Sequence, residues 1–374
     1  MTGSTEPAVG FRRRAEAERA QEAVMPGGSV VVSCSAPFGA GGLGRHSKEI
    51  IAALDRLGRP SVYIGEPGGE SDGSASPPRL SERAVDLALS PLTRYSPAWR
   101  LWKASVRFDR DAVRRLPEAE NLMSFNGTSL AQFHAVRGRM DSLSLVSATA
   151  HLRRLVRQHA AARRRYPLER SWATRVLHRN LREYALADRI YVSSRYVWES
   201  FVQEGIPEEA LSLFPLTPDP RFQPDRTAES SSAFEIVYVG GLTVDKGVPL
   251  LVDAVRRLPE SDIALKLVGG WKTPAMRRFI GEAVASDGRI EVCPGDPLPR
   301  LRAASLYVHA AYSDGFGYAP AEALASGVPV IVSEDTGMKD LIEPGVNGLV
   351  LPTGDLDALT AAIEAAYRRE TLTP

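Results

Sequence analysis

Two carboxylates bracket a glycine loop in the second half of the chain. Asp314 directly precedes Gly315, and Glu322 follows eight positions later. The stretch 306–308 before this loop is apolar and predicts a buried strand, whereas 321–325 is strong helix-forming sequence. Open α/β sheets bind ligands outside the carboxyl ends of their strands. Both carboxylates are therefore expected at such an edge, where their oxygens suit the hydroxyl groups of a sugar or a ribose.

The loop between the carboxylates has the composition of an anion-binding turn. Gly315 and Gly317 allow a ligand to approach the backbone closely. Pro320 is expected at the first helical position and Gly327 just past the helix end, which is the usual punctuation of a helix. Backbone N–H groups and the positive end of the helix dipole would then point at the ligand.

A lysine follows a second glycine turn. Residues 240–247 read GGLTVDKG and close a predicted strand over 235–239. Lys246 is therefore expected beside the same carboxyl edge, where its ammonium group could pair with a phosphate. A solvated surface lysine explains the same residue equally well, so both interpretations stay open.

The first half of the chain carries a weaker signal of the same kind. A predicted strand over 30–32 leads into the glycine-rich turn 36–46, which includes Gly42 and Arg45. The functional interpretation places backbone N–H groups near a diphosphate or a sugar. A tight turn between a strand and a helix also requires glycine, so the turn alone does not decide between the two.

His151 opens a strongly basic stretch. From His151 to Arg182 there are ten arginines and one acid, Glu169. Solvated helix faces with apolar residues packed inward explain the stretch, and a basic surface for anionic lipid headgroups or a phosphorylated acceptor is the alternative. Upstream, aromatic and basic residues alternate over 99–110, which suits either an interfacial anchor or buried core. A lone histidine such as His151 is more often structural than catalytic.

The composition limits the classes of function. The chain has 374 residues, of which 44% are hydrophobic and 24% charged, with a formal net charge of +1. This charge argues against general nucleic-acid binding. Cys34 and Cys293 lack metal-ligand or redox spacing and are expected to be buried thiols. No apolar stretch reaches the ~20 residues of a membrane span, and no secretory signal is recognisable, so a cytoplasmic location is expected.

Alternating strand and helix patterns predict parallel sheets with right-handed crossovers. The length suggests two domains. The expected order is a polar N-terminal extension over 1–27, a first domain over 28–218, a linker over 219–233 and a second domain over 234–374. Strands of the second domain are predicted at 235–239, 264–268, 290–293, 306–309, 329–333 and 348–351, and the last strand of the first domain at 211–216.

Together these motifs resemble the glycosyltransferase family 4 group, retaining enzymes of the GT-B fold. That α/β fold has two Rossmann-like, doubly wound domains that face each other across a cleft. The family's V-G-R-L-x-x-x-K-G turn, E-G-F-G loop and G-x-P-V-I stretch correspond here to 239–247, 314–317 and 327–331, and the resemblance covers most of 29–365. Two positions depart from it: Gly241 stands where the family has arginine, and Asp314 where it has glutamate.

The resemblance implies roles for individual residues. A nucleoside-diphosphate sugar would bind mainly to the second domain and an acceptor mainly to the first. Lys246 and a helix N-terminus would neutralise the diphosphate with no metal or other cofactor, while Glu322 would hold the ribose hydroxyls. His151 matches the family's donor-sugar histidine only loosely. The expected site residues are Lys246, Asp314 and His151 for catalysis, and Glu322, Gly315, Phe316, Gly317, Tyr318, Gly241, Gly42 and Arg45 for donor binding.

The expected function is that of a retaining hexosyltransferase using a UDP- or GDP-sugar. Its acceptor is a glycan, a lipid-linked molecule or a small molecule, with no nucleic-acid partner, and a peripheral contact with an anionic membrane stays open. Without an arginine at position 241 the protein loses a bidentate phosphate contact worth about 1.5–3 kcal/mol, which Arg45 could replace. A non-catalytic sugar-nucleotide or glycan-binding protein and a sugar phosphorylase are the alternatives on the same fold.

Overall fold

The computed structural model describes residues 8–65, 97–224 and 233–369. Contacts within the chain define two compact units. The first unit contains 1–156, 170–193 and 197–216, and the second contains 157–169, 194–196 and 217–374. Two short segments from the predicted first domain thus pack with the second unit. The expected domain limits otherwise stay a prediction.

The first unit is built on a six-stranded parallel sheet with the order β2-β1-β3-β4-β5-β6. The predicted last strand ends three residues early, at Leu213, because Pro215 has no amide hydrogen to continue the ladder. The strands are β1 (Val30–Ser33), β2 (Ser61–Ile64), β3 (Asn121–Phe125), β4 (Ser142–Ser147), β5 (Arg189–Val192) and β6 (Leu211–Leu213).

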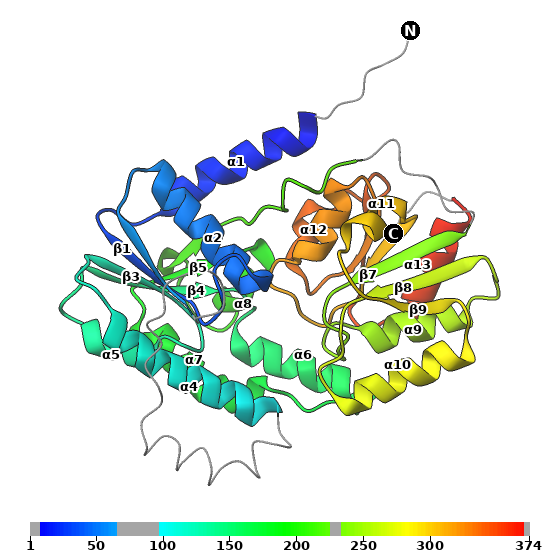
Figure 1. Ribbon diagram of the computed structural model, residues 1–374, viewed down its shortest axis with the longest axis horizontal. Helices are drawn as coiled ribbons and strands as arrows, with labels where there is room; N and C mark the ends of the chain where they lie inside the picture. The colour runs from blue at the N-terminus through cyan, green and yellow to red at the C-terminus, as the bar shows by residue number, and fades with distance from the viewer. Residues whose placement is uncertain (1–7, 66–96, 225–232, 370–374) are drawn as a thin grey trace. The chain divides into compact units, whose positions relative to one another are not determined.

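Helices cover both faces of the first sheet (Figure 1). On one side lie α1 (Ala8–Val24) and α2 (Gly41–Arg56), and on the other lie α4 (Pro97–Arg115), α5 (Leu130–Val136) and α7 (Ala173–Leu186). Two helices contribute residues to both units, α6 (Leu152–Arg165) and α8 (Arg195–Val202). A 3₁₀ helix (Glu208–Ala210) precedes β6.

Part of the predicted N-terminal extension is a docked helix. The side-chain amide of Gln21 is buried and donates to the carbonyl of Pro215 at 2.7 Å and to Glu49 at 3.2 Å. Met25, just after α1, is also buried. Polar contacts attach this helix to the first unit, and α1 has no wide apolar face. Hydrophobic periodicity therefore could not reveal the docking.

The second unit is built on another six-stranded parallel sheet, ordered β12-β11-β10-β7-β8-β9. Each of its strands lies within one residue of the predicted one. The chain leaves β7 toward β8 and β9 and then returns to β10 on the other side of β7, so the strand order reverses there. The strands are β7 (Phe234–Val239), β8 (Ile263–Val268), β9 (Ile290–Cys293), β10 (Leu306–His309), β11 (Val330–Ser333) and β12 (Gly348–Leu351).

Helices also cover both faces of the second sheet. In Figure 1, α11 (Leu298–Ala303) and α12 (Tyr318–Ala325) lie on one side, and α9 (Val248–Arg257) and α10 (Pro274–Ser286) on the other. Helix α13 (Leu356–Tyr367) packs against α9, and a 3₁₀ helix, η2 (Gly337–Leu341), follows β11. Apolar side chains of α9, α10 and α13 form one continuous core with the strands.

The basic stretch after His151 packs as helix faces. Leu152, Leu155, Ala173 and Val176 form a small buried cluster, against which Trp102 packs. The inward-facing residues predicted for this stretch are therefore confirmed. Both cysteines are free and buried, as expected.

The single acid of that stretch has a structural role in the second unit. Glu169 accepts hydrogen bonds from the Val244 N–H at 2.7 Å and from the Thr273 hydroxyl at 2.9 Å. Burial raises the pKa of its carboxyl group. Within the three described ranges, no helix combines the length and the apolar character needed to cross a bilayer.

Candidate functional site

Three charged or polar side chains meet where the strand order of the second sheet reverses. The Lys246 ammonium donates to Oδ2 of Asp314 at 2.7 Å, and Nε2 of His309 lies 2.9 Å from the same oxygen. Lys246 follows β7, whereas His309 ends β10 and Asp314 lies in the loop beyond it. Ligands of open α/β sheets bind at such a switch point. Sequence reasoning predicted two members of this group and missed His309.

The turn that carries Lys246 is held against the end of β10. Gly247, the residue just before α9, has a φ of 71°, and a Cβ at this position would lie 1.8 Å from the carbonyl oxygen of Ala310. Only glycine fits both constraints. On the other side of Lys246, the carbonyl of Asp245 accepts the Tyr312 N–H at 2.9 Å. Lys246 is thus fixed from both neighbouring residues.

The loop that carries Asp314 is held by its backbone. Its N–H donates to the carbonyl of Asp335 at 3.1 Å, and its own carbonyl accepts the Gly337 N–H at 3.0 Å. These bonds tie the loop after β10 to the loop after β11. One residue further, the Ser194 hydroxyl donates to the carbonyl of Gly315 at 2.6 Å. The backbone of Asp314 is therefore fixed by hydrogen bonds within the fold.

Aromatic rings pack against His309, the histidine of this group. The His309 side chain is 3% exposed, and its ring stacks with Tyr238 and Tyr307 at centroid distances of 6.3 and 6.4 Å. The Tyr238 hydroxyl donates to the carbonyl of Gly241 at 2.9 Å, and the Tyr307 hydroxyl donates to the carbonyl of Val239 at 3.2 Å. These bonds reach the turn after β7 and the last residue of β7, so this ring layer connects His309 to the turn that carries Lys246.

The ion pair is charged across the neutral pH range. Although burial acts to raise it, Lys246 and His309 hold the pKa of Asp314 well below its usual range. Burial acts to lower the pKa of Lys246, but the carboxylates of Asp314 and Asp245 raise it overall. The positive charge of Lys246 is therefore already balanced by the protein, and an incoming anion must compete with Asp314.

Glu322 lies deeper than the sequence suggests. Helix α12 begins at Tyr318, so Pro320 is its third residue and not its first, and Glu322 falls in the second turn. The helix starts earlier because Gly317, at a φ of 89°, supplies the left-handed residue before it. The Glu322 side chain is 4% exposed. Burial raises the pKa of Tyr307, and the carboxylates of Asp314 and Glu322 raise it further, so both carboxylates lie near one ring.

The remaining loop residues offer backbone more than side chain. Phe316 is buried and packs edge-to-face with Tyr318 at 5.2 Å. A Cβ on Gly317 would lie 2.9 Å from Met338 and 3.0 Å from Pro320, so a side chain has no room there. What the loop from Gly315 to Tyr318 presents to a ligand is mainly its amide groups.

Gly241 does not need to be glycine. A Cβ there would make ordinary contacts, 3.6 Å from Lys272 and 3.8 Å from Thr243, and its φ is not in the left-handed region. The departure from the family's arginine is therefore not imposed by the backbone. The Lys272 side chain, from the loop after β8, passes beside this position.

The expected residues of the first half belong to the first unit. Gly42 and Arg45 lie in the first turns of α2, directly after β1. His151 is 2% exposed and packs against Tyr184 at 4.8 Å and Phe201 at 5.1 Å. Its environment is that of a packed aromatic residue, so the structural interpretation fits it better. The part of all three residues in donor binding stays a prediction.

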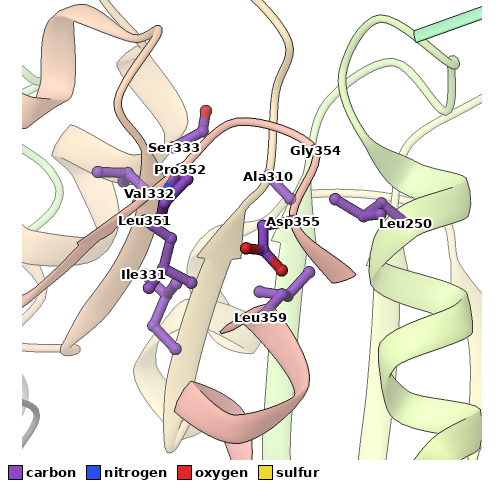
Figure 2. Close-up of a pocket in the computed structure, with 10 residues that line it drawn as sticks. All are labelled: Leu250, Ala310, Ile331, Val332, Ser333, Leu351, Pro352, Gly354, Asp355 and Leu359. Atoms are coloured by element: carbon purple, nitrogen blue, oxygen red, sulfur yellow. The ribbon is translucent and has the colours of Figure 1, made fainter. Parts of the chain in front are cut away.

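Two hollows do not belong to this group. A cavity of about 10 Å³ lies at the carboxyl ends of β10, β11 and β12 beside α9 and α13 (Figure 2). This volume accommodates about one water molecule and no sugar. A hollow of about 660 Å³ in the first unit adjoins the start of β3, at the amino edge of its sheet. The small cavity is lined by Leu250, Ala310, Ile331, Val332, Ser333, Leu351, Pro352, Gly354, Asp355 and Leu359.

Among the described residues, no group of three or more histidine, cysteine, aspartate and glutamate side chains is placed to hold a metal ion. The predicted independence from metal stays a prediction.

The residues that match a known protein family lie in the second unit. Residues 233–369 match the family model described as glycosyl transferases group 1. A GDP-mannose-dependent alpha-mannosyltransferase of Corynebacterium glutamicum is 36% identical over 140 residues, which is 36% of this chain and 32% of that protein. Sulfoquinovosyl transferase SQD2 of Arabidopsis thaliana is 29% identical over 141 residues, 36% of this chain and 27% of that protein.

A third relative extends a little further. The putative colanic acid biosynthesis glycosyltransferase WcaL of Escherichia coli is 26% identical over 192 residues, 47% of each chain. The chain thus spans between about a quarter and about half of the length of these curated relatives.

Solved structures match over nearly the whole chain. Sucrose-phosphate synthase from Thermosynechococcus elongatus superposes with a TM-score of 0.69 at 20% identity, covering 92% of both chains. The glycosyltransferase WaaG superposes with a TM-score of 0.64 at 17% identity, covering 91% of this chain and 90% of that one. The predicted GT-B fold is therefore confirmed, and the matches support the GT-B glycosyltransferase superfamily. The facing of the two domains across a cleft stays a prediction.

The constraint on Gly247 leads to a prediction about the turn. In Gly247→Ala, the new Cβ meets the Ala310 carbonyl and the residue must hold a left-handed φ, which costs about 1–3 kcal/mol. We expect a lower thermal unfolding midpoint and weaker binding of nucleoside diphosphates, because Lys246 moves with the turn. Gly241→Ala is the matched control and should change neither. An unchanged midpoint and affinity in Gly247→Ala would contradict this account of the turn.

Proposed function

We propose that the protein is a retaining glycosyltransferase of the hexosyltransferase type. It transfers a sugar from a UDP- or GDP-sugar to an acceptor hydroxyl without a metal ion. The observation that carries this proposal is the group of Lys246, Asp314 and His309 at the switch point of the second sheet. This group lies inside the residues that match the glycosyltransferase family model. The donor in the name of a similar protein, GDP-mannose, supports a nucleoside-diphosphate sugar.

Lys246 is the residue that meets the leaving diphosphate. Its ammonium exchanges the Asp314 carboxylate for a phosphate oxygen, so that one ion pair replaces another. The amides of the Gly315 to Tyr318 loop and the start of α12 add a positive potential on the same edge. Charge that develops on the leaving group is thereby stabilised by groups already in place, which is the main source of catalysis in such a site.

Glu322 and Asp314 have separate tasks in this proposal. Glu322 accepts hydrogen bonds from the ribose hydroxyls, as expected from the resemblance. The oxygens of Asp314 suit the hydroxyl groups of a sugar, but Oδ2 is engaged by Lys246 and His309. We therefore assign Asp314 to the placement of Lys246 in the ligand-free protein, and the sugar to the amides of the loop.

One alternative is favoured by a specific observation. The charge of Lys246 is balanced by Asp314, and Gly241 supplies no second cation from the same turn. Both features weaken the hold on a diphosphate and fit a non-catalytic sugar-nucleotide-binding protein. Nucleotide binding by calorimetry without transfer or hydrolysis of any donor would favour that alternative.

The acceptor and the membrane contact are proposed for the first unit. Leu101 on α4 is 43% exposed, and its neighbours Arg100 and Arg107 are exposed as well. Phe108 of the same helix is buried, and Trp102 packs against the Leu152 cluster. Arg100, Arg107 and Leu101 are therefore the residues that we propose to contact an anionic membrane carrying a lipid-linked acceptor. Phe108 and Trp102 belong to the core. A cytoplasmic location fits this proposal.

The first prediction from this function concerns the two charged site residues. Lys246→Ala removes the cation at the leaving group and should lower kcat about 100-fold, the size seen for loss of one such contact. Glu322→Gln should mainly raise KM for the donor, because it weakens the ribose contact. Transfer and hydrolysis assays across UDP- and GDP-sugars measure both. Lys266→Ala, which removes an ion-paired lysine from β8, is the control. Equal turnover in all variants would count against the assignment.

The second prediction restores the missing cation. Gly241→Arg adds a guanidinium to the turn that carries Lys246, without backbone strain, and a charged hydrogen bond to the diphosphate is worth about 1.5–3 kcal/mol. The affinity for UDP or GDP should rise roughly 10- to 100-fold in calorimetry. Gly288→Arg adds the same charge before β9, at the opposite edge of the sheet, in open space. If both variants gain equally, or neither gains, the diphosphate does not bind at this turn.

The third prediction concerns the membrane. The protein should co-sediment at low salt with vesicles that contain anionic lipid. The double variant Arg100→Glu and Arg107→Glu should bind a several-fold smaller fraction, since each basic residue contributes about 1 kcal/mol near such a surface. Vesicles of neutral lipid are the control. Absence of binding to anionic vesicles at low salt would remove this part of the proposal.

A further inference from the structure

Lys272 lies beside the turn that carries Lys246. It belongs to the loop after β8, and a Cβ on Gly241 would lie 3.6 Å from Cε of Lys272. This is an ordinary van der Waals distance, so the aliphatic part of Lys272 occupies the space next to the glycine. The missing side chain at Gly241 therefore leaves room for a cation that comes from another loop.

Backbone contacts hold the loop of Lys272 against this turn. The Leu242 N–H donates to the carbonyl of Gly270 at 3.0 Å. A Cβ on Gly269 would lie 1.8 Å from the carbonyl oxygen of Gly240, so the two loops touch where they leave β7 and β8. Lys272 is therefore fixed at the carboxyl edge of the sheet, next to the strand that borders the switch point.

A carboxylate ties the same two loops together. Glu169 accepts hydrogen bonds from the Val244 N–H at 2.7 Å and from the hydroxyl of Thr273, the residue after Lys272, at 2.9 Å. Burial raises the pKa of Glu169 and the charge of Asp245 adds to the rise, while the charge of Lys272 acts to lower it. The ammonium of Lys272 and the carboxylate of Asp245 therefore lie around one acidic group, at the end of the turn that carries the site lysine.

Lys272 differs from Lys246 in the balance of its charge. The ammonium of Lys246 is paired with Asp314 at 2.7 Å. Lys272 is exposed and forms no ion pair with a carboxylate of the described residues. A diphosphate carries several negative charges, which one lysine with a carboxylate partner does not neutralise. A second ammonium from the neighbouring loop adds a charge-assisted hydrogen bond to the phosphates.

We propose that Lys272 is a donor-binding residue that brings a second positive charge to the diphosphate, through the space that Gly241 leaves open. The inference rests on the proposed function of this site and deepens it by naming a further residue that meets the ligand. The diphosphate is then held by one lysine from the turn after β7 and one from the loop after β8. An ammonium group on a flexible stem makes a point contact in place of a bidentate one.

A contact between charges has a signature that packing lacks. Loss of a charge that meets the phosphates weakens the binding of UDP and GDP, but not that of uridine and guanosine, which have no phosphate. It also makes the affinity less sensitive to salt, because one charge pair fewer is screened. A purely structural role of Lys272 would change the binding of nucleosides and nucleoside diphosphates together.

The test is calorimetry with UDP, GDP, uridine and guanosine at low and at high salt. Lys272→Met keeps the aliphatic stem and removes the charge, so its affinity for the diphosphates should fall about tenfold, the size of one charged hydrogen bond. Its affinity for the nucleosides should not change. Lys272→Arg keeps the charge and should bind as wild type. Lys266→Met removes a lysine of β8 that is paired with Glu291 and is the matched control.

A double variant tests whether the two positions serve one phosphate site. The gain in affinity from Gly241→Arg should then be several-fold larger in the Lys272→Met background than in wild type, because side chains that share a partner are not additive. Equal gains in both backgrounds would show that Lys272 and position 241 act at separate places, and would overturn the inference.

The outcomes separate the two claims. If wild type binds neither UDP nor GDP, the proposed function and this inference both fail. If Lys246→Ala weakens the binding of the diphosphates and Lys272→Met does not, the inference fails while the proposed function stands. An equal loss for nucleosides and diphosphates in Lys272→Met, or an unchanged dependence on salt, would also overturn it. Thermal unfolding midpoints close to that of wild type establish that each variant is folded.

Discussion

The ion pair between Lys246 and Asp314 is the interaction on which the site depends. Two partly buried charges are stable together only when their geometry is good and other groups complete the hydrogen bonds. Here the 2.7 Å contact joins the loops after β7 and β10, and His309 completes the carboxylate. The turn at Gly247 and the backbone bonds of Asp314 hold both ends of the pair. Contacts within the chain therefore hold the site together, and the charge of Lys246 is balanced by Asp314.

The sheet explains why these residues meet at all. The strand order reverses between β7 and β10, and at such a switch point neighbouring crossovers leave toward opposite sides of the sheet. Many chemistries use such folds, so the fold alone does not define a function. In this chain the edge carries a lysine whose charge is balanced and a layer of three rings, from His309, Tyr238 and Tyr307. It also carries the buried Glu322. In the proposed function, an anion enters by exchange with Asp314.

Much of this could be predicted from the sequence where local rules decide. Apolar runs between glycine turns located the strands of the second sheet to within one residue, and the turn motifs located Lys246 and Asp314. His309 could not be found, although the predicted strand already ends there, because its role depends on which strand pairs beside β10. The docking of α1 through Gln21 and the start of α12 at Tyr318 likewise depend on contacts that no local pattern contains.

The central claim is that Lys246 gives up Asp314 to bind a diphosphate. A crystal structure of the protein with UDP or GDP tests it most directly. The account predicts a diphosphate oxygen about 3 Å from the Lys246 ammonium, with Asp314 still hydrogen-bonded to His309. A nucleotide bound elsewhere, with the Lys246–Asp314 pair unbroken, would contradict it.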